Sequence, residues 1–345
     1  MTQDLRIIDF DKYMGGLSSG LEECGGFVTT EAVNIDSNNA IPFFASHKQQ
    51  PNIIECSQGS DADIAIFNPF LGSSYYSPKW DSDFDLTKLN DIFTWILKFE
   101  PRCAIICISF GSEKYLQSDK LIPAIDGWAA YDLVFEKLSS TYNCCKINTS
   151  ALQYGLSQDF DEVFYIAVHH REDPSNIVLP KPKILNPYDY HTIEYAIGDL
   201  NKLQYDDTFT NDFISYCKEK EVPLSFHKPD YRHMHKIANI DEGSKKDTGR
   251  TFRYKSIYRD IRPKYNKFCP NLRHDFYYIS SSGPSIHPIL NRTLTIREGA
   301  RLHGFPDHFT WSKQTKKRDI GVMLKNGVSP IFGHILSPTI KSILL

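Results

Sequence analysis

Short apolar segments alternate with amphipathic stretches along the first 170 residues of the chain. Apolar runs of strand length occur at 5–10 (LRIIDF), 62–67 (ADIAIF), 103–110 (CAIICISF) and 163–168 (VFYIAV), and FVTTEAVNID at 27–36 reads as a further strand. Unbroken apolar strands are typical of a parallel sheet that is buried on both faces. The pattern therefore predicts a sheet at the centre of this part of the chain.

Two segments between these runs have the pattern of helices. GGLSSGLEECGG, at 15–26, combines a glycine-rich start with a glycine stop, and DLTKLNDIFTWILKF, at 85–99, repeats its apolar residues with helical spacing. The repeated order of strand, helix and strand indicates a doubly wound parallel sheet with right-handed crossovers. We predict an α/β domain over residues 1–170.

The pattern changes after residue 171. PSNIVLPKPKILNPYDYH is irregular and rich in proline, and the segment that follows it is basic and aromatic. Regular periodicity returns in LTIREGARLHGF, where Thr295 and Glu298 have the spacing of a helical capping box. The apolar segment VSPIFGHILSPTIKSILL reads as helix broken at Pro338. We therefore expect a smaller, less regular domain at 171–285 and a segment at 286–345 that returns to the first domain.

Positive charge is concentrated in one part of a chain that is slightly acidic overall. The formal net charge is −3, but residues 227–275 carry thirteen Lys and Arg against six Asp and Glu, a local balance of +7 that leaves −10 for the rest. Aromatic and basic residues are interleaved there, as on surfaces that bind a nucleic-acid backbone. The alternative is an ordinary solvated segment. The residues predicted to line a DNA-binding groove are Arg250, Arg253, Lys255, Arg259, Arg262, Lys264 and Lys267.

Composition sets a broad class and excludes others. The 345 residues are 41% hydrophobic and 23% charged, which is ordinary for a globular chain. No apolar run reaches the length of a membrane span, and MTQDLRIIDF lacks the pattern of a signal peptide. The eight cysteines include no C-x-x-C pair, which argues against a zinc site. We expect an intracellular protein of the cytoplasm or nucleus, with no metal and no membrane contact.

Three motifs, in this order along the chain, resemble the DNA (cytosine-5) methyltransferase family. DFDKYMGGLSSGLEECGG at 9–26 is similar to the family's first motif, NRTLTIREGARLHGFPDHF at 291–309 to its ninth, and KNGVSP at 325–330 to its tenth. The ninth is the most specific match. The resemblance implies a Rossmann-like methyltransferase domain, a target-recognition domain in the basic middle of the chain, and S-adenosylmethionine as cofactor.

The same resemblance implies catalytic positions that this chain fills with other residues. The family attacks C6 of a flipped cytosine with a Cys thiolate that follows a Pro. Here the corresponding loop is FNPFLGSS at 67–74. The substituted positions are Phe70 for the nucleophile, Cys107 for the Glu that contacts the cytosine, and Phe160 and Glu162 for two supporting arginines; Gln158 of the same element is kept.

The cofactor site implied by the resemblance is altered too. Tyr13 replaces a glycine of the glycine-rich loop, Asp11 stands where a Phe packs on the adenine, and Asn34 stands where an acid binds the ribose. The vestigial cofactor positions are Asp11, Tyr13, Gly15, Gly16, Asn34 and Asn326. Gly15 and Gly16 are equally well explained by packing of a helix, and Asn326 by an anchor for the last segment. Arg292 and Arg297 are open to two interpretations, phosphate contacts or ion pairs with Glu298 or Asp307.

These substitutions lead to two hypotheses of function. The first is a non-catalytic homologue, a pseudoenzyme, that acts as a DNA-binding or regulatory subunit with an active methyltransferase or a restriction partner and needs no cofactor. The second is an active DNA (cytosine-5) methyltransferase with altered motifs that uses S-adenosylmethionine. Asn-Pro-Phe at 68–70 also resembles the Asn-Pro-Pro-Phe of amino-methylating enzymes, with one Pro missing. Whether DNA or RNA is bound stays open at this point.

Overall fold

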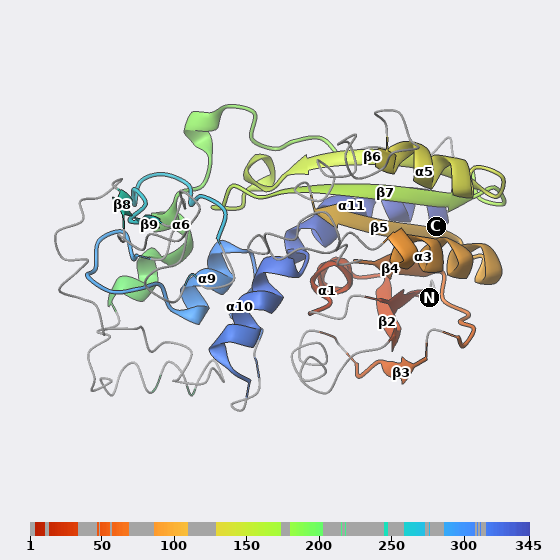
Figure 1. Ribbon diagram of the computed structural model, residues 1–345, viewed down its shortest axis with the longest axis horizontal. Helices are drawn as coiled ribbons and strands as arrows, with labels where there is room; N and C mark the ends of the chain where they lie inside the picture. The colour runs from red at the N-terminus through yellow and green to blue at the C-terminus, as the bar shows by residue number, and fades with distance from the viewer. Residues whose placement is uncertain are drawn as a thin grey trace, which may run out of the picture.

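An open seven-stranded sheet forms the centre of the larger body in the computed structural model, and helices cover both of its faces (Figure 1). The structure describes residues 4–10, 14–33, 47, 49–55, 57–68, 86–109, 129–173, 180–202, 215, 218, 245–247, 259–272, 276, 286–307, 309, 311 and 315–345. The strands of the sheet are β1 (Leu5–Asp9), β2 (Phe27–Val33), β3 (Asn52–Ile54), β4 (Ile64–Phe67), β5 (Cys103–Ser109), β6 (Tyr142–Ser150) and β7 (Asp161–His169). They lie in the order β3-β2-β1-β4-β5-β7-β6.

The sheet is mixed, so the expectation of a wholly parallel sheet is wrong at one strand. β3, β2, β1, β4 and β5 run parallel, whereas β7 is antiparallel to both β5 and β6. Only the short connection 151–160, which contains the 3-10 helix η1 (Ala151–Tyr154), joins β6 to β7. A parallel crossover needs a dozen or more residues, usually including a helix, so this connection favours an antiparallel pair.

The hydrophobic core of this larger body has two halves, one on each face of the sheet. Ile7 faces one half and its neighbour Ile8 faces the other, as the alternation of side chains along a strand requires. The first face is covered by α1 (Gly16–Glu23) and α11 (Pro330–Leu344), and the second by α3 (Leu86–Phe99) and α5 (Ala129–Leu138). The helices expected at 15–26 and 85–99 therefore form where the pattern places them.

Helix α11 continues through Pro338, which corrects the expected break. Pro338 lies on the exposed side of the helix, while Phe332, Leu336 and Ile340 are fully buried on the other. A proline inside a helix costs about 3 kcal/mol or more. Burial of a large apolar side chain contributes about 1.5–3 kcal/mol, so several such side chains outweigh that cost.

Glycines let α1 and α11 approach each other very closely. A Cβ atom on Gly16 would lie 2.0 Å from the carbonyl oxygen of Val328, and one on Gly20 would lie 2.0 Å from that of Pro330. From the other helix, a Cβ on Gly333 would lie 2.5 Å from both Leu17 O and Leu21 N. The packing interpretation of Gly16 is therefore confirmed.

A second core forms beside the sheet and is made by later parts of the chain (Figure 1). It joins α6 (Ile193–Ile197), α9 (Ile296–Leu302) and α10 (Lys317–Asn326) to buried residues of 262–276. Near it lie the 3-10 helices η3 (Pro187–Asp189) and η4 (Gly198–Lys202) and the two-stranded sheet of β8 (Lys245–Asp247) and β9 (Arg259–Ile261). Of segment 286–345, α11 thus packs on the large sheet, whereas α9 and α10 belong to this second core. Within the described ranges, no helix has the length and apolar character to cross a membrane.

Candidate active site

Two positions that the sequence analysis selects for their chemistry meet inside the sheet. Cys107 lies on β5 and Glu162 near the start of β7, diagonally across the antiparallel pair, because Cys107 pairs with Phe164. The Cys107 Sγ donates a hydrogen bond to Glu162 Oε2 at 3.3 Å, and the two residues are 1% and 4% exposed. From β6, Thr149 Oγ1 donates to the backbone carbonyl of Glu162 at 2.9 Å. Three strands therefore enclose a buried thiol–carboxylate pair.

Phe160, at the other position implied for an arginine, is part of the hydrophobic core. Its ring lies 4.6 Å from the His303 ring and 6.1 Å from Phe332, measured between centroids. Phe160 and Glu162 thus bring an aromatic ring and an acid to positions where the resemblance implies two cations.

Gln158, which the resemblance marks as kept, is fully buried in a structural contact. Its Oε1 lies 3.4 Å from His303 Nδ1, and His303 Nε2 lies 3.3 Å from the carbonyl oxygen of Gly327. Burial lowers the pKa of His303 to about 4, although the hydrogen bond to Gly327 opposes the shift. A neutral imidazole carries one N–H, so it donates to only one of these two oxygens, and its ring lies between Gln158 and the turn that joins α10 to α11.

The described residues of the implied cofactor site each have a structural role. Gly15 is the N-cap of α1 with a φ of 62°, a conformation that favours glycine. The carbonyl oxygen of Asn326, the last residue of α10, accepts a hydrogen bond from Asn68 Nδ2 at 3.0 Å. This contact uses the backbone of residue 326, so the anchoring role of the Asn326 side chain stays a prediction. Phe70, Asp11, Tyr13 and Asn34 lie outside the described residues.

A buried polar network beneath α1 was not found from the sequence. Ser18 Oγ donates to Asp9 Oδ2 and lies 3.5 Å from His47 Nε2, while His47 Nδ1 is 3.3 Å from Glu22 Oε2. The backbone N–H of Thr29 donates to Glu22 Oε1 at 2.6 Å. The order Ser, His and acid is that of a hydrolase triad, but Ser18 is 0% exposed and its proton already points to Asp9. The spacing of Ser18 and Glu22, four residues apart on a helix, is the signal that could have revealed the network.

In the described part of the basic segment, one residue expected to bind DNA is buried instead. Arg262, expected to line a DNA groove, is only 4% exposed. Its guanidinium donates to the carbonyl oxygens of His287, Pro288 and Leu290 at 3.1, 3.3 and 3.2 Å, and to Asn291 Oδ1 at 2.8 Å. A planar group with five donors is well suited to such a set of acceptors. Lys264 and Lys267 are exposed, the side chain of Arg259 is outside the described set, and so are Arg250, Arg253 and Lys255.

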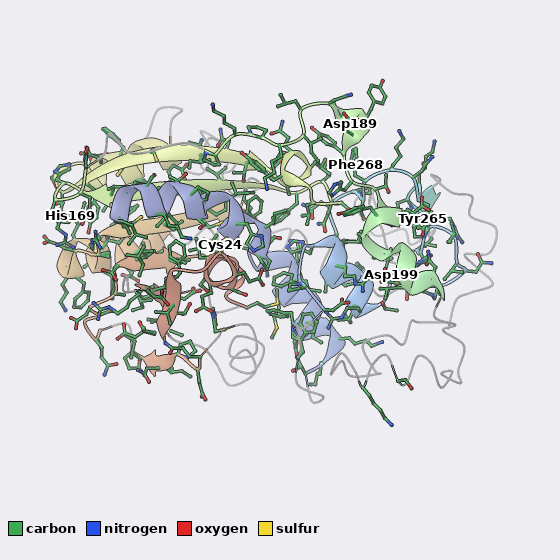
Figure 2. All side chains as sticks on the ribbon, turned by 180° about the vertical axis from the view of Figure 1, so that it is seen from behind. Cys24, His169, Asp189, Asp199, Tyr265 and Phe268 are labelled. Carbon is green, nitrogen blue, oxygen red and sulfur yellow. The ribbon has the colours of Figure 1, made fainter. Side chains whose placement is uncertain are left out.

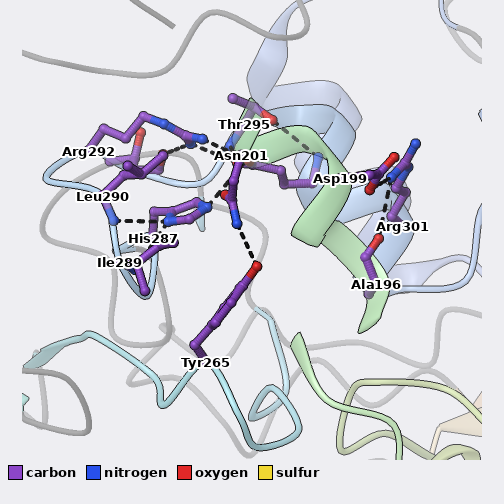
Figure 3. A network of polar contacts seen from close by, with 12 residues as sticks. Ala196, Asp199, Asn201, Tyr265, His287, Ile289, Leu290, Arg292, Thr295 and Arg301 are labelled. Atoms are coloured by element: carbon purple, nitrogen blue, oxygen red, sulfur yellow. Dashed lines mark hydrogen bonds and ion pairs between the residues drawn. The ribbon is translucent and has the colours of Figure 1, made fainter. Parts of the chain in front are cut away.

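The start of α9 is fixed by a buried ion pair (Figure 3). Arg292 Nη1 and Nη2 donate to the two oxygens of Glu298 at 2.8 and 2.7 Å. Thr295 and Glu298 form the expected capping box, with Thr295 N donating to Glu298 Oε2 at 2.8 Å. Burial opposes ionisation of Glu298, but the charge and hydrogen bonds of Arg292 prevail and lower its pKa to about 2. The ion-pair interpretation of Arg292 is therefore confirmed.

His287 completes this network from the other side. Its Nδ1 accepts from the backbone N–H groups of Ile289 and Leu290 at 3.3 and 3.1 Å, which leaves Nε2 facing Glu298 Oε1 at 3.6 Å (Figure 3). Burial lowers the pKa of His287 to about 3. Arg297 is also internal, since it donates to Pro306 O at 3.1 Å and Phe309 O at 2.8 Å. The described arginines of the ninth motif thus hold the fold together.

Comparison with known proteins adds evidence from outside the chain. A family model described as C-5 cytosine-specific DNA methylase matches residues 132–341. The Type II methyltransferase M.DdeI of Desulfomicrobium norvegicum is 23% identical over an alignment of 246 residues, and the match covers 61% of this chain and 57% of that protein. The chain thus spans little more than half the length of this relative.

Two solved structures are similar over nearly the whole chain. One is a protein encoded within an E. coli prophage and assigned as a DNA modification methyltransferase, with a TM-score of 0.69, 20% identity and 99% coverage of both chains. The other is the S. pombe Dnmt2 methyltransferase, with a TM-score of 0.63, 13% identity and 98% coverage of both chains. At these identities the likeness establishes the fold.

Proposed function

The chain belongs to the family of C-5 cytosine-specific DNA methylases, and from this premise we propose that it has kept the fold and lost the chemistry. It acts as a non-catalytic DNA-binding or regulatory subunit and works with an active methyltransferase or a restriction partner. DNA is its ligand, and S-adenosylmethionine is not required. The proposal fits a scaffold in which the capping box, the close α1–α11 contact and the ninth motif are all intact.

The contact between Cys107 and Glu162 carries the proposal. In the family chemistry, a Glu at the first position contacts the target cytosine and an Arg at the second supports the pocket. Here a thiol and a carboxylate occupy these positions and bond to each other at 3.3 Å, so neither side chain is directed at a substrate. A buried carboxylate that loses its donor is costly, which favours keeping the pair closed.

Changes elsewhere in the sequence support the same conclusion. A phenyl ring at Phe70 cannot add to a pyrimidine, and the sequence has no Cys between Cys56 and Cys103 that a shift of register would bring there. By the resemblance, Tyr13 stands at a glycine position of the cofactor loop, and Asn34 stands at the position of the acid that binds the ribose. Each lost charge-assisted hydrogen bond costs about 1.5–3 kcal/mol, or roughly tenfold or more in affinity.

An active enzyme is the second candidate, and the observation that favours it is the chemical identity of the two groups in this contact. A thiol and a carboxylate are the two reactive groups that the family uses, and this chain has both. The thiol is on β5 instead of in the loop after β4, and the carboxylate is on β7 instead of on β5. For catalysis, Cys107 would have to become accessible and ionised, although it is 1% exposed. The two candidates differ in whether Cys107 is required for any reaction.

A methyl-transfer assay separates these candidates. Purified protein incubated with DNA and tritiated S-adenosylmethionine should incorporate no label above a heat-killed control, because nucleophile, acid and supporting cation are all replaced. Phe70→Cys should be equally inactive, since the other positions stay defective. Calorimetric titration should give no micromolar dissociation constant for the cofactor. Label that appears with the wild type and disappears in Cys107→Ser would instead establish the rearranged enzyme.

A further inference from the structure

The three most exposed large apolar side chains in the described part of the chain belong to one segment, residues 180–195, which we call the arm. Leu185, Tyr188 and Tyr195 are 74%, 88% and 70% exposed, and they lie within eleven residues of one another. The arm projects from the molecule around η3, where Asp189 is labelled in Figure 2. Exposed apolar side chains that form one patch mark an interaction site, and all three of these belong to one short segment.

The arm has a fixed conformation. Asn186 caps η3 by accepting a hydrogen bond from the backbone N–H of Tyr188 at 3.2 Å, and Pro187 begins its first turn. At the base of the arm, the backbone N–H groups of Lys183 and Ile184 donate to Gln153 O at 3.0 and 2.9 Å. The exposed rings are therefore presented on a preorganised support, which lowers the entropic cost of binding.

Four exposed lysines lie on the arm and on the segment that is hydrogen-bonded to it. Lys181 and Lys183 belong to the arm itself. Lys264 and Lys267 come from the basic segment and are brought alongside because the backbone N–H of Ile193 donates to Lys267 O at 2.8 Å. The ring centroids of Tyr190 and Phe268 lie 6.1 Å apart, which joins the same two segments again.

The acidic residues near the arm are fewer and partly neutralised. Asp189 and Glu194 are exposed, whereas Asp199 is paired with Arg301 at 2.5 Å. Next to Tyr195 the surface is hollowed by a cleft of about 270 Å³ that Leu156, Ile331 and Arg301 help to line. Exposed rings, a surplus of ammonium groups and a partly apolar cleft favour a polyanion with flat apolar groups.

We propose that this aromatic–lysine surface, made by Lys181, Lys183, Leu185, Tyr188, Tyr195, Lys264 and Lys267, binds a single-stranded stretch of nucleic acid. A ring as exposed as Tyr188 can stack only on a base whose face is open, and bases inside a duplex are covered on both faces. Aromatic stacking with phosphate-binding lysines is the usual way in which proteins hold unpaired strands. The inference rests on the proposed function, since the strand would continue from the duplex bound by the basic segment.

Fluorescence anisotropy on the full chain at low salt tests this surface. The probes are a labelled duplex of about 20 base pairs and the same duplex with an overhang of about ten nucleotides, a length that suits one stacking surface. The overhang should tighten binding by the wild type. Tyr188→Ala should weaken binding to the overhang probe by about tenfold. The double variant Lys181→Ala with Lys183→Ala should lower the slope of log affinity against log salt, measured with the overhang probe, by about 1.4. Phe135→Ala and Lys137→Ala on α5, also exposed, should change neither value.

Each outcome of this experiment decides for or against the surface. If the overhang adds nothing to wild-type binding, the inference fails while the duplex binding of the proposed function stands. If the gain persists in the Tyr188 and lysine variants, these side chains do not hold the strand and the inference fails. If neither probe binds even at low salt, this inference and the DNA-binding function fail together. A gain that is lost in the variants and kept in the α5 controls supports it.

Discussion

At the scale of single residues, this chain repeatedly satisfies its charges internally. Arg262 is bound by three carbonyl oxygens and an amide, and Arg292 is held by both oxygens of Glu298. Removing one partner of such a buried pair typically costs about 3–5 kcal/mol. The positive charge available to a ligand is therefore smaller than a count of Lys and Arg implies.

Two buried histidines should make stability fall with acidification. Burial lowers the pKa of His303 to about 4 and that of His287 to about 3, from ordinary values near 6.5. Both are neutral when folded, so below about pH 6.5 the unfolded chain binds protons that the folded chain refuses. The free energy of unfolding should decrease between pH 6.5 and 4 by up to about 1.4 kcal/mol per pH unit for each group.

Urea denaturation at several pH values between 7 and about 4 measures this slope. The Gln side chain of His303→Gln can still donate to Gly327 O. This variant should lower the slope of unfolding free energy against pH by the amount that corresponds to about one bound proton. His170→Gln is the matched control because His170 is exposed. A slope that is the same in wild type and His303→Gln would show that His303 is charged in the folded protein.

At the scale of elements, local signals were sufficient for local structure. The capping box of α9 was predictable because Thr295 and Glu298 lie three residues apart and bond to each other's backbone within one turn. The direction of β7 and the continuity of α11 across Pro338 could not be predicted, because both depend on packing between distant segments. The strand β6 was missed since YNCCKINTS mixes polar and apolar residues, as an edge strand does.

In the candidate site too, the sequence predicted individual positions but not the contacts between distant segments. Substitutions at Cys107 and Glu162 could be read from the motifs, but their contact required the register of β5 on β7. Arg262 was misassigned because the sequence shows its charge and not the carbonyl oxygens that fold around it. The network of Asp9, Ser18, His47 and Glu22 joins two segments that the sequence does not link.

The contact of α1 with α11 predicts a large effect from one added methyl group. In Gly333→Ala, the new Cβ would meet Leu17 O and Leu21 N at 2.5 Å, and both are backbone atoms that cannot rotate away. Overpacking of this kind costs about 1–3 kcal/mol, which urea denaturation would detect. His334→Ala, at the next and exposed position, loses only a surface pair with Glu23 and should cost less than about 1 kcal/mol. Equal stability of Gly333→Ala and wild type would mean that the helices lie further apart.

At the scale of the whole molecule, charge separates into a basic middle and an acidic remainder. Residues 227–275 carry a balance of +7 in a chain of net charge −3. If this segment contacts phosphates, log affinity for duplex DNA should fall steeply with log salt, by about 0.9 per neutralised phosphate. Binding should therefore weaken strongly between low and physiological salt.

Changing Arg253, Lys255 and Arg259 together to Ala should weaken duplex binding and flatten the salt slope by roughly two to three units. Lys98→Ala with Lys137→Ala, on α3 and α5, is the control and should leave the slope unchanged. Arg262→Ala should act differently, by lowering stability, because its guanidinium is buried. A triple variant with the wild-type slope would identify these three residues as an ordinary solvated face.

The pairing of α1 with α11 also affects the order in which the chain can fold during synthesis. About three hundred residues are synthesised between Glu23, where α1 ends, and Pro330, where its partner helix begins. Until residues 330–344 leave the ribosome, the apolar face around Leu21 and Phe27 has no cover. We therefore expect the contact of α1 with α11 to form in a late step of folding, because it joins segments far apart in the sequence.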